Sequence, residues 1–215
     1  MEMDIDVRDL PLVLASASPR RREILEAHGH SLVVIPAEID ETVPDGANLT
    51  PEELTIHLAE LKADAVAGIL KPEDWPRGCA ILGVDTIVYK DHVIGKPVDE
   101  ADALNILRSL KNSTHEVISG VCIIRMLPME VIFAEGHRRE RRLSKTGKIK
   151  FSESTRVQMG DYTDEEILEY VRANPPYDKS GSYAIQSDWG KHVLSLEGDI
   201  ENVIGLPYAR LSEYF

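Results

Sequence analysis

The stretch LVLASASPRRR, residues 12–22, indicates the kind of fold to expect. It begins with the short apolar run Leu12 to Ala15, which is typical of a buried strand. Ser18 and Pro19 then supply a helix N-cap and a proline at the first helical position, so a helix should follow and end near Gly29. A strand that leads directly into a helix predicts an α/β protein.

Strands and helices continue to alternate along the rest of the chain. Apolar or β-branched runs predict strands at residues 32–35, 80–89, 114–126 and 150–159, with a short return strand after residues 90–92. Helices are expected from the capping boxes at Thr50 and Thr163, and over residues 99–110 and 205–214. The helix from Thr50 should bury one apolar stripe, formed by Leu54, Leu58, Leu61 and Ala65.

A polar segment between two long predicted strands bears on the topology. Residues 135–148 are rich in Arg and Lys and look like a long hairpin connection between strands 114–126 and 150–159. Hairpin-linked strands are antiparallel, whereas strands joined through a helix are parallel. We therefore expect a mixed sheet. Because the sequence has no clear linker or repeat, we expect one domain, residues 1–215, with two lobes.

Composition limits the classes of partner. Asp plus Glu number 37 against 24 Lys plus Arg, a formal net charge of -13, which disfavours general nucleic-acid binding but allows a local cationic pocket. The two cysteines, Cys79 and Cys122, have no metal-binding spacing and lie in apolar runs, so we expect buried, reduced thiols. With no signal-peptide pattern and no membrane-length apolar run, the sequence predicts a cytoplasmic protein without a membrane partner.

The helix start at residues 16–22 is a candidate anion site. Ser16, Ser18 and three arginines stand where a helix presents free N–H groups and the positive end of its dipole. Hydroxyls and guanidinium groups at such a place suit phosphate oxygens. The alternative is a capped helix with a solvated basic first turn. Because arginine in a first turn opposes the dipole, the anion site is favoured.

Three further residues could carry chemistry. Asp85 lies inside an apolar run, so its carboxylate should be paired, bonded to backbone amides or bound to a metal. Lys96 lies between Gly95 and Pro97, in a turn that either aims it or merely exposes it. Lys62 lies beside an apolar stripe and could instead extend harmlessly to solvent.

Five short motifs occur in a fixed order: S-x-S-P-R-R at 16–21, G-x-D-T at 83–86, K-P at 96–97, D-K-x-G-x-Y-x-I-Q at 178–186 and N-x-x-G-L-P at 202–207. Each is weak alone, but the ordered set is specific. In these motifs the chain resembles the Maf family of nucleotide pyrophosphatases, relatives of the inosine-triphosphate pyrophosphatase fold. The resemblance implies a two-lobed, mixed-sheet α/β fold with a central cleft, and a homodimer.

The resemblance also implies an activity and a site. The activity is hydrolysis of a nucleoside triphosphate to its monophosphate and pyrophosphate, helped by Mg²⁺ or Mn²⁺. Asp85 matches the proposed general base, and Glu41 would assist it in holding the metal. The implied substrate-binding residues are Ser16, Arg20, Arg21, Lys62, Thr86, Lys96 and Gln186.

Gln186 bears on the choice of base. An amide offers one acceptor and one donor, which suits N3–H and O4 of uracil or thymine, whereas a Glu would accept twice from guanine. Maf proteins that act on dTTP and UTP resemble this chain in carrying Gln, and those that act on 7-methyl-GTP typically carry Glu. We therefore expect dTTP, UTP or a modified pyrimidine nucleotide, with 7-methyl-GTP as the alternative.

Two other functions stay open. A non-catalytic, nucleotide-binding regulator of cell division would bind a triphosphate without turning it over. The basic stretch at residues 137–142 is longer than expected of the family, and we interpret it as a solvated hairpin loop rather than a nucleic-acid contact.

Overall fold

A mixed sheet forms the centre of the protein. The computed structural model describes residues 6–41, 48–132 and 139–215, and within these the sheet has seven strands. They are β1 (Leu12–Leu14), β2 (Leu32–Val34), β3 (Cys79–Lys90), β4 (His92–Ile94), β5 (Thr114–Ile132), β6 (Arg139–Met159) and β7 (Val193–Glu197). Their order is β2-β1-β3-β5-β6-β7, with β4 paired to β3. β2, β1 and β3 are parallel and the other pairs antiparallel, which confirms the predicted mixed-sheet α/β fold.

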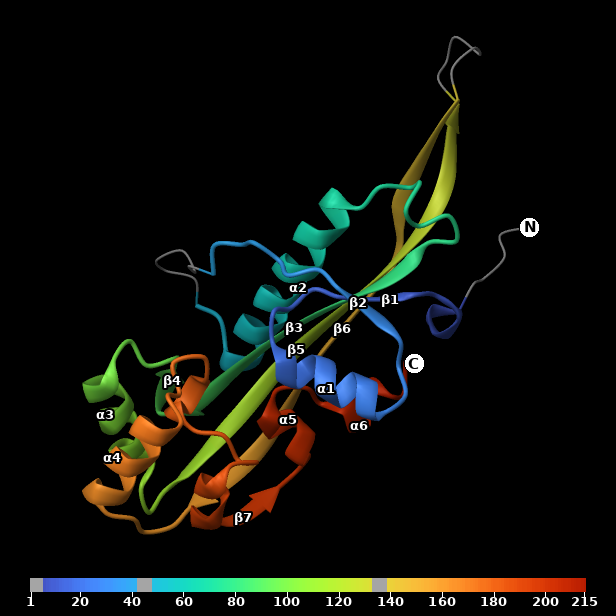
Figure 1. Cartoon of the computed structure of the whole chain (residues 1–215). Coiled ribbons are helices and arrows are strands. Elements are labelled where there is room, and N and C mark those ends of the chain that lie inside the picture. The colour runs from blue at the N-terminus through green and yellow to red at the C-terminus, as the bar shows by residue number, and fades with distance from the viewer. Residues whose placement is uncertain (1–5, 42–47, 133–138) are drawn as a thin grey trace.

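Helices cover both faces of this sheet (Figure 1). They are α1 (Pro19–Ala27), α2 (Pro51–Ile69), α3 (Glu100–Leu110), α4 (Asp164–Ala173), α5 (Ile200–Ile204) and α6 (Tyr208–Leu211), with short 3₁₀ turns at Val7–Asp9, Ser180–Ser182 and Asp188–His192. α2 lies on one face, α1, α5 and α6 lie on the other, and α3 and α4 pack together at one end of the molecule. Within the described ranges, no helix has both the length and the apolarity to cross a membrane.

The helix ends follow the predicted local chemistry. Both capping boxes form, with Thr50 and Thr163 each accepting from the backbone N–H three residues on. α1 ends just before Gly29, whose φ of +86° is in the left-handed region that glycine favours. The helix expected over residues 205–214 is confirmed only in part, because α6 covers Tyr208–Leu211 alone. Gly205, at a φ of +129°, ends the preceding helix α5 and does not begin α6.

The buried face of α2 differs from the prediction. Leu58 is buried as expected, but Leu54, Leu61 and Ala65 are only partly covered. The residues that face the sheet are mainly small, namely Thr55, Ala59, Ala63, Val66 and Ala67. The prediction ranked residues by hydrophobicity, whereas this helix approaches the sheet so closely that small side chains fit best.

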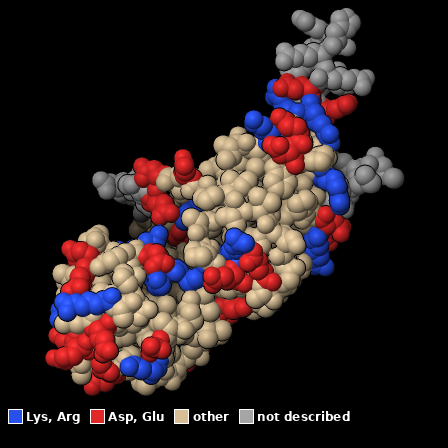
Figure 2. All heavy atoms as spheres, viewed as in Figure 1, with Lys and Arg blue, Asp and Glu red and all other residues tan. Residues whose placement is uncertain are grey.

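The hairpin predicted through residues 135–148 is confirmed in its pairing, because β5 and β6 are antiparallel neighbours, but its bounds are wrong. Residues 139–148 belong to β6, which pairs with β5 out to Ile132, and only residues 135–138 of the predicted connection lie outside the description. The basic stretch at 137–142 therefore starts outside the described residues and continues into a strand. Its ribbon projects from the body, with basic and acidic side chains mixed along it (Figures 1 and 2). Residues 139–148 of β6 are almost all polar, so they lack the apolar alternation by which strands are predicted.

Ion pairs tie β6 to α2. Lys148 and Lys150 donate to Glu60 at 2.7 and 2.9 Å, and Lys145 donates to Asp64 at 2.7 Å. Partly exposed pairs of this kind stabilise weakly one by one. Together they hold the outer side of α2 against the ribbon.

The apolar core runs along the long strands rather than between separate units. On β3, Ile81 packs under α2, Val84 packs on the α1 face, and Val88 belongs to the cluster around α3 and α4. On β5, Cys122 and Val117 likewise contribute to clusters at different ends. Cys79 and Cys122 are buried free thiols as predicted, and burial raises the pKa of each to about 12.

His115 gives the fold a defined response to acid. Its ring is buried, and its Nε2 lies 2.8 Å from the Tyr183 hydroxyl oxygen. Burial, with a smaller effect of the nearby Lys90 charge, lowers the pKa of His115 from 6.5 to about 4. Between these values the unfolded chain takes up a proton that the folded chain does not. Folding stability is therefore lost as the pH falls from about 6.5 to 4.

We expect His115→Gln to weaken this response. Urea denaturation at pH 7 and pH 5 should show a loss of unfolding free energy that is about 2 kcal/mol smaller in the variant than in the wild type. Comparing the two proteins cancels the carboxylates that also titrate in this range. Equal losses in both proteins would show that His115 does not have a depressed pKa.

Candidate active site

A gap in the sheet forms the floor of the candidate site. β1 pairs with Ala80–Leu82 of β3, and β4 pairs with Val88–Lys90 on the same edge. Residues 83–87 between them pair with β5 on the opposite edge, and no described strand covers the gap. Successive side chains on a strand point to opposite faces, so Asp85 points toward α2 and Thr86 toward α1. At the gap both side chains reach the same space.

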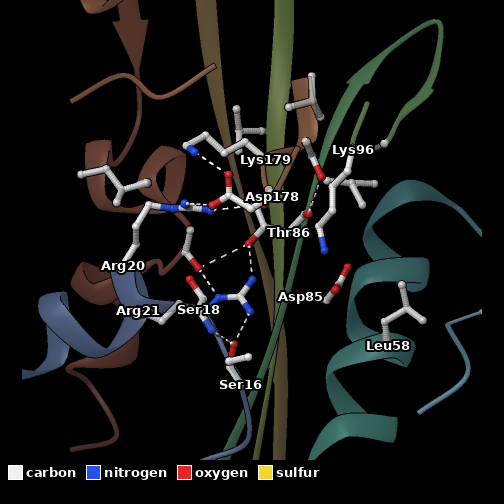
Figure 3. Close-up of a pocket in the computed structure, with 18 of the residues that line it drawn as sticks. Ser16, Ser18, Arg20, Arg21, Leu58, Asp85, Thr86, Lys96, Asp178 and Lys179 are labelled. Atoms are coloured by element: carbon white, nitrogen blue, oxygen red, sulfur yellow. Dashed lines mark hydrogen bonds and ion pairs between the residues drawn. The ribbon is translucent and has the colours of Figure 1, made fainter. Parts of the chain in front are cut away.

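A cavity of about 600 Å³ opens at this gap. Its walls come from the end of β1, the start of α1, one side of α2, the turn after β4 and the segment after α4 (Figure 3). All nine residues predicted for the site line it: Ser16, Arg20, Arg21, Glu41, Lys62, Asp85, Thr86, Lys96 and Gln186.

On the α2 side, a lysine stands between two carboxylates. Lys62 Nζ lies 2.5 Å from Asp85 Oδ1 and 2.8 Å from Glu41 Oε1. Lys62 and Asp85 are only 12% and 11% exposed, so Lys62 turns into the cavity and not to solvent. Burial acts to raise the pKa of Glu41, but the hydrogen bond and charge of Lys62 outweigh it and lower that pKa, with help from Lys96 and Arg21.

Two glycines allow α2 to come this close. A Cβ on Gly83 would lie 2.1 Å from the Ala59 carbonyl oxygen, and a Cβ on Gly120 would lie 2.1 Å from the Thr55 carbonyl carbon. Gly120 is the cross-strand partner of Asp85. The close approach of helix and sheet therefore occurs beside Asp85, and it brings Lys62 within reach of that carboxylate.

On the α1 side, Arg21 joins three segments of the chain. It donates to Ser16 Oγ at 2.8 Å, to the Gly205 carbonyl at 2.8 Å and to Thr86 Oγ1 at 3.0 Å. These acceptors are all neutral. Burial lowers the pKa of Arg21, partly offset by the charge of Asp85, but an arginine stays protonated at any working pH. The result is a fixed positive charge beside the gap.

The start of α1 keeps its free backbone donors. Ser18 occupies the N-cap position as predicted, yet its side chain makes no capping hydrogen bond. Ser16 Oγ instead accepts from the Ser18 backbone N–H at 3.2 Å. The first N–H groups of the helix are therefore available to an anion in the cavity.

A second charged cluster, formed by Arg20, Asp178 and Lys179, lies on the other side of Thr86 from Asp85 (Figure 3). Asp178 Oδ2 accepts from Arg20 Nη1 at 2.6 Å, and Asp178 Oδ1 accepts from Lys179 Nζ at 2.5 Å. Burial acts to raise the pKa of Asp178, but the hydrogen bonds from Lys179 and Arg20 outweigh it and hold that pKa at about 2. This carboxylate is therefore ionised throughout the neutral range.

The last two predicted residues are less constrained. Lys96 and Gln186 are exposed, and both line the cavity. Among the described residues, Lys96 has no ion-pair partner, so its amine is available to a ligand.

Other residues of the site carried no predicted role. The fully buried Ser119 bonds Thr86 Oγ1 at 2.9 Å, and the Gly205 carbonyl accepts from Arg21. A signal for Ser119 exists, because Ser119 and Gly120 interrupt the apolar run of β5. Asn202, from the last motif, has a structural role: it is fully buried, it does not line the cavity, and its amide donates to the Val117 carbonyl at 2.9 Å.

The described residues contain no group of three or more His, Cys, Asp or Glu side chains arranged to hold a metal. Carboxylate oxygens from Asp85 and Glu41 nevertheless meet at Lys62 on the cavity wall. A divalent cation here would need ligands from a bound substrate as well.

These features define an α/β protein with a cation-lined cavity at a break in its sheet, built to receive an anion beside a carboxylate. A family model described as Maf-like protein matches residues 11–215, and the chain belongs to the Maf family.

Three relatives are similar to this chain over nearly their whole length. A protein of Agathobacter rectalis is 37% identical over 208 residues, covering 93% of each chain. One of Bacillus thuringiensis subsp. konkukian is 38% identical over 201 residues, covering 93% of this chain and 91% of the relative. One of Koribacter versatilis is 39% identical over 201 residues, covering 93% of this chain and 90% of the relative. Each bears the name dTTP/UTP pyrophosphatase.

Proposed function

We propose that this protein is a nucleoside triphosphate pyrophosphatase that hydrolyses dTTP and UTP to the monophosphate and pyrophosphate. The observation that carries the proposal is the carboxylate of Asp85, held 2.5 Å from Lys62 at the floor of a cavity that Arg20, Arg21 and Lys96 also line. The relatives named dTTP/UTP pyrophosphatase support the same activity and these substrates.

The residues suit this reaction. A water molecule attacks the α-phosphorus, a new P–O bond forms, and the bond to the bridging oxygen breaks as pyrophosphate leaves. Asp85 would accept the proton of the attacking water. Arg21, fixed by its three neutral acceptors, would stabilise negative charge on the phosphate oxygens without having to reorganise, and Lys62 and Lys96 would add to this stabilisation.

We propose that Asp85 and Glu41 hold a divalent metal, Mg²⁺ or Mn²⁺, together with phosphate oxygens. The donor set fits, because hard cations prefer oxygen ligands and Mg²⁺ often uses only one or two carboxylates when it binds a nucleotide. When bound, such a metal would neutralise phosphate charge. Lys62, which contacts both carboxylates in this structure, would then be released toward the substrate.

Gln186 would select the base. Its exposed amide on the cavity wall can accept from the N3–H of uracil or thymine and donate to O4. Replacing it by a carboxylate removes the donor.

A panel of nucleotides tests the activity. We expect pyrophosphate release from dTTP and UTP in the presence of Mg²⁺, less from CTP, ITP and 7-methyl-GTP, and none after EDTA treatment. Gln186→Glu should lower kcat/KM for dTTP by about tenfold or more, because one hydrogen bond is lost and an unpaired acceptor faces O4. Tight binding of every nucleotide without turnover would reject the enzyme and favour a binding regulator. Preference of the wild type for 7-methyl-GTP would reject the role of Gln186.

We further propose that the protein acts in the cytoplasm as a homodimer. The two buried free thiols support a reducing compartment, and the dimer rests on the family resemblance. Light scattering of the purified protein tests the dimer.

A further inference from the structure

An exposed carboxylate stands among the cations of the cavity. The Asp178 side chain is 54% exposed, whereas its two partners, Arg20 and Lys179, are 21% and 20% exposed. A negative charge at this place repels an incoming polyphosphate. The carboxylate therefore weakens binding unless it does something that offsets the repulsion.

The contacts of Asp178 indicate how this carboxylate offsets the repulsion of the substrate. Each carboxylate oxygen takes one cation, Arg20 at 2.6 Å and Lys179 at 2.5 Å, and the Asp178 backbone carbonyl also accepts from Arg20 Nη2 at 3.5 Å. Without the carboxylate between them, the positive charges of Arg20 and Lys179 would repel each other. Neither cation uses all its donors here, so both can still bind a ligand.

The segment that carries Asp178 is itself anchored to the gap. Ser180 Oγ donates to the Thr86 carbonyl at 3.3 Å, and the Gly181 N–H donates to the Gly95 carbonyl at 3.2 Å. The Lys179 N–H closes a turn on the Pro176 carbonyl at 2.9 Å. Asp178 is thus set in place relative to Thr86 on the floor and to the turn that carries Lys96.

We propose that Asp178 is a positioning residue, which holds Arg20 and Lys179 in the places where they meet the substrate. The inference rests on the proposed function. Long, charged side chains lose conformational freedom when a ligand orders them, and a protein that has already ordered them binds more tightly. Asp178 stays ionised at every working pH, so this arrangement does not depend on pH.

Steady-state kinetics of Asp178→Asn with dTTP test the proposal. The amide keeps the shape of the side chain but loses the charge that holds both cations. We expect KM to rise about tenfold and kcat to stay within about twofold, the pattern of lost substrate binding. Asp178→Glu, which keeps the charge, should recover part of the loss. Asp164→Asn is the matched control, because Asp164 is 56% exposed and pairs with Arg108 at 2.9 Å on the surface, and its kinetics should not change.

A double-mutant cycle identifies the partner through which Asp178 acts. If Asp178 works by holding Arg20, then Arg20→Ala already removes most of the benefit. Asp178→Asn should then raise KM in the Arg20→Ala background by much less than in the wild type. A parallel cycle with Lys179→Ala tests the other partner, and additive effects in both cycles would overturn the proposal.

The sign of the change in KM is equally decisive. A lower KM in Asp178→Asn would mean that Asp178 only competes with the substrate for the cations. An unchanged KM with a lower melting temperature would mean that its role is only structural. Either result overturns the proposal.

Binding measurements separate this proposal from the proposed activity. Calorimetric titration of dTTP is carried out with Asp85→Asn, with and without Asp178→Asn. A tenfold weaker Kd in the double variant, with no turnover by the wild type, would reject the activity alone. Equal Kd values in the two variants, with turnover by the wild type, would reject the role of Asp178 alone.

Discussion

Asp85→Asn should lower kcat for dTTP hydrolysis by roughly 10²- to 10⁴-fold, the range expected when a general base is removed. The amide fits the same space but cannot accept a proton from water. Lys62 keeps Glu41 as a partner at 2.8 Å, so the substitution leaves no unpaired buried lysine and the variant should fold. Pyrophosphate release at saturating dTTP and Mg²⁺ measures the loss.

Glu60→Gln provides the control. Like Asp85, Glu60 is a carboxylate bonded to lysine, but it lies on α2, and its partners Lys148 and Lys150 lie on β6, outside the cavity. Its turnover should equal that of the wild type. If Asp85→Asn retained more than about a tenth of wild-type kcat, Asp85 could not be the base.

Gly120→Ala should damage both stability and activity, although Gly120 does not line the cavity. The added Cβ would lie 2.1 Å from the Thr55 carbonyl carbon and 2.3 Å from the Ile56 nitrogen, which are backbone atoms that can move only if α2 moves. We expect a loss of about 3 kcal/mol in the free energy of unfolding. A displacement of α2 by about 1 Å would move Lys62 and could lower kcat about 100-fold. Urea denaturation and steady-state kinetics measure the two effects.

Gly68→Ala tests whether the damage comes from the close approach of helix and sheet or whether α2 tolerates no added methyl group anywhere. Gly68 lies in the same helix, and a Cβ there meets nothing within 4 Å. We expect this variant to be more stable than the wild type by about 0.5 to 1 kcal/mol, because glycine is a poor helix former. Wild-type stability of Gly120→Ala would show that helix and sheet are not in close contact at Asp85.

Local chemistry made much of the fold predictable from the sequence. The capping boxes at Thr50 and Thr163 mark helix starts because the side chains satisfy the first N–H groups wherever the rest of the chain lies. Phe151, Thr155 and Val157 stand at alternate positions of the strand predicted at residues 150–159, and all three lie on the buried face of β6. Features that depend only on residues a few positions apart in the sequence can be recognised in this way.

Features set by distant contacts were missed. Ala59 and Thr55 of α2 match Gly83 on β3 and Gly120 on β5, which lie 24 and 65 positions further along the chain, so the sequence of the helix alone does not reveal this match. The outer part of β6 pairs with β5 while exposed on both faces, so its sequence has no apolar period.

The site likewise combines features that follow from local sequence with features set by distant contacts. The motifs contain seven of the nine residues that the structure brings to one cavity, since each motif is a short local pattern, whereas Glu41 and Lys62 were assigned through the family resemblance. How they come together depends on the gap left between β1 and β4, which only the strand pairing reveals. Asp178 was recognised within its motif, yet its contact with Arg20 joins residues 158 positions apart.

The long strands have a consequence for how this architecture can change. β3 and β5 supply side chains to the apolar clusters at both ends of the molecule, and the gap that forms the cavity floor lies midway along β3. Neither end could be removed, exchanged or acquired as a separate module without cutting the strands that the other end needs. New substrates are therefore more readily reached by altering the turns and loops around the cavity than by recombining halves of the chain.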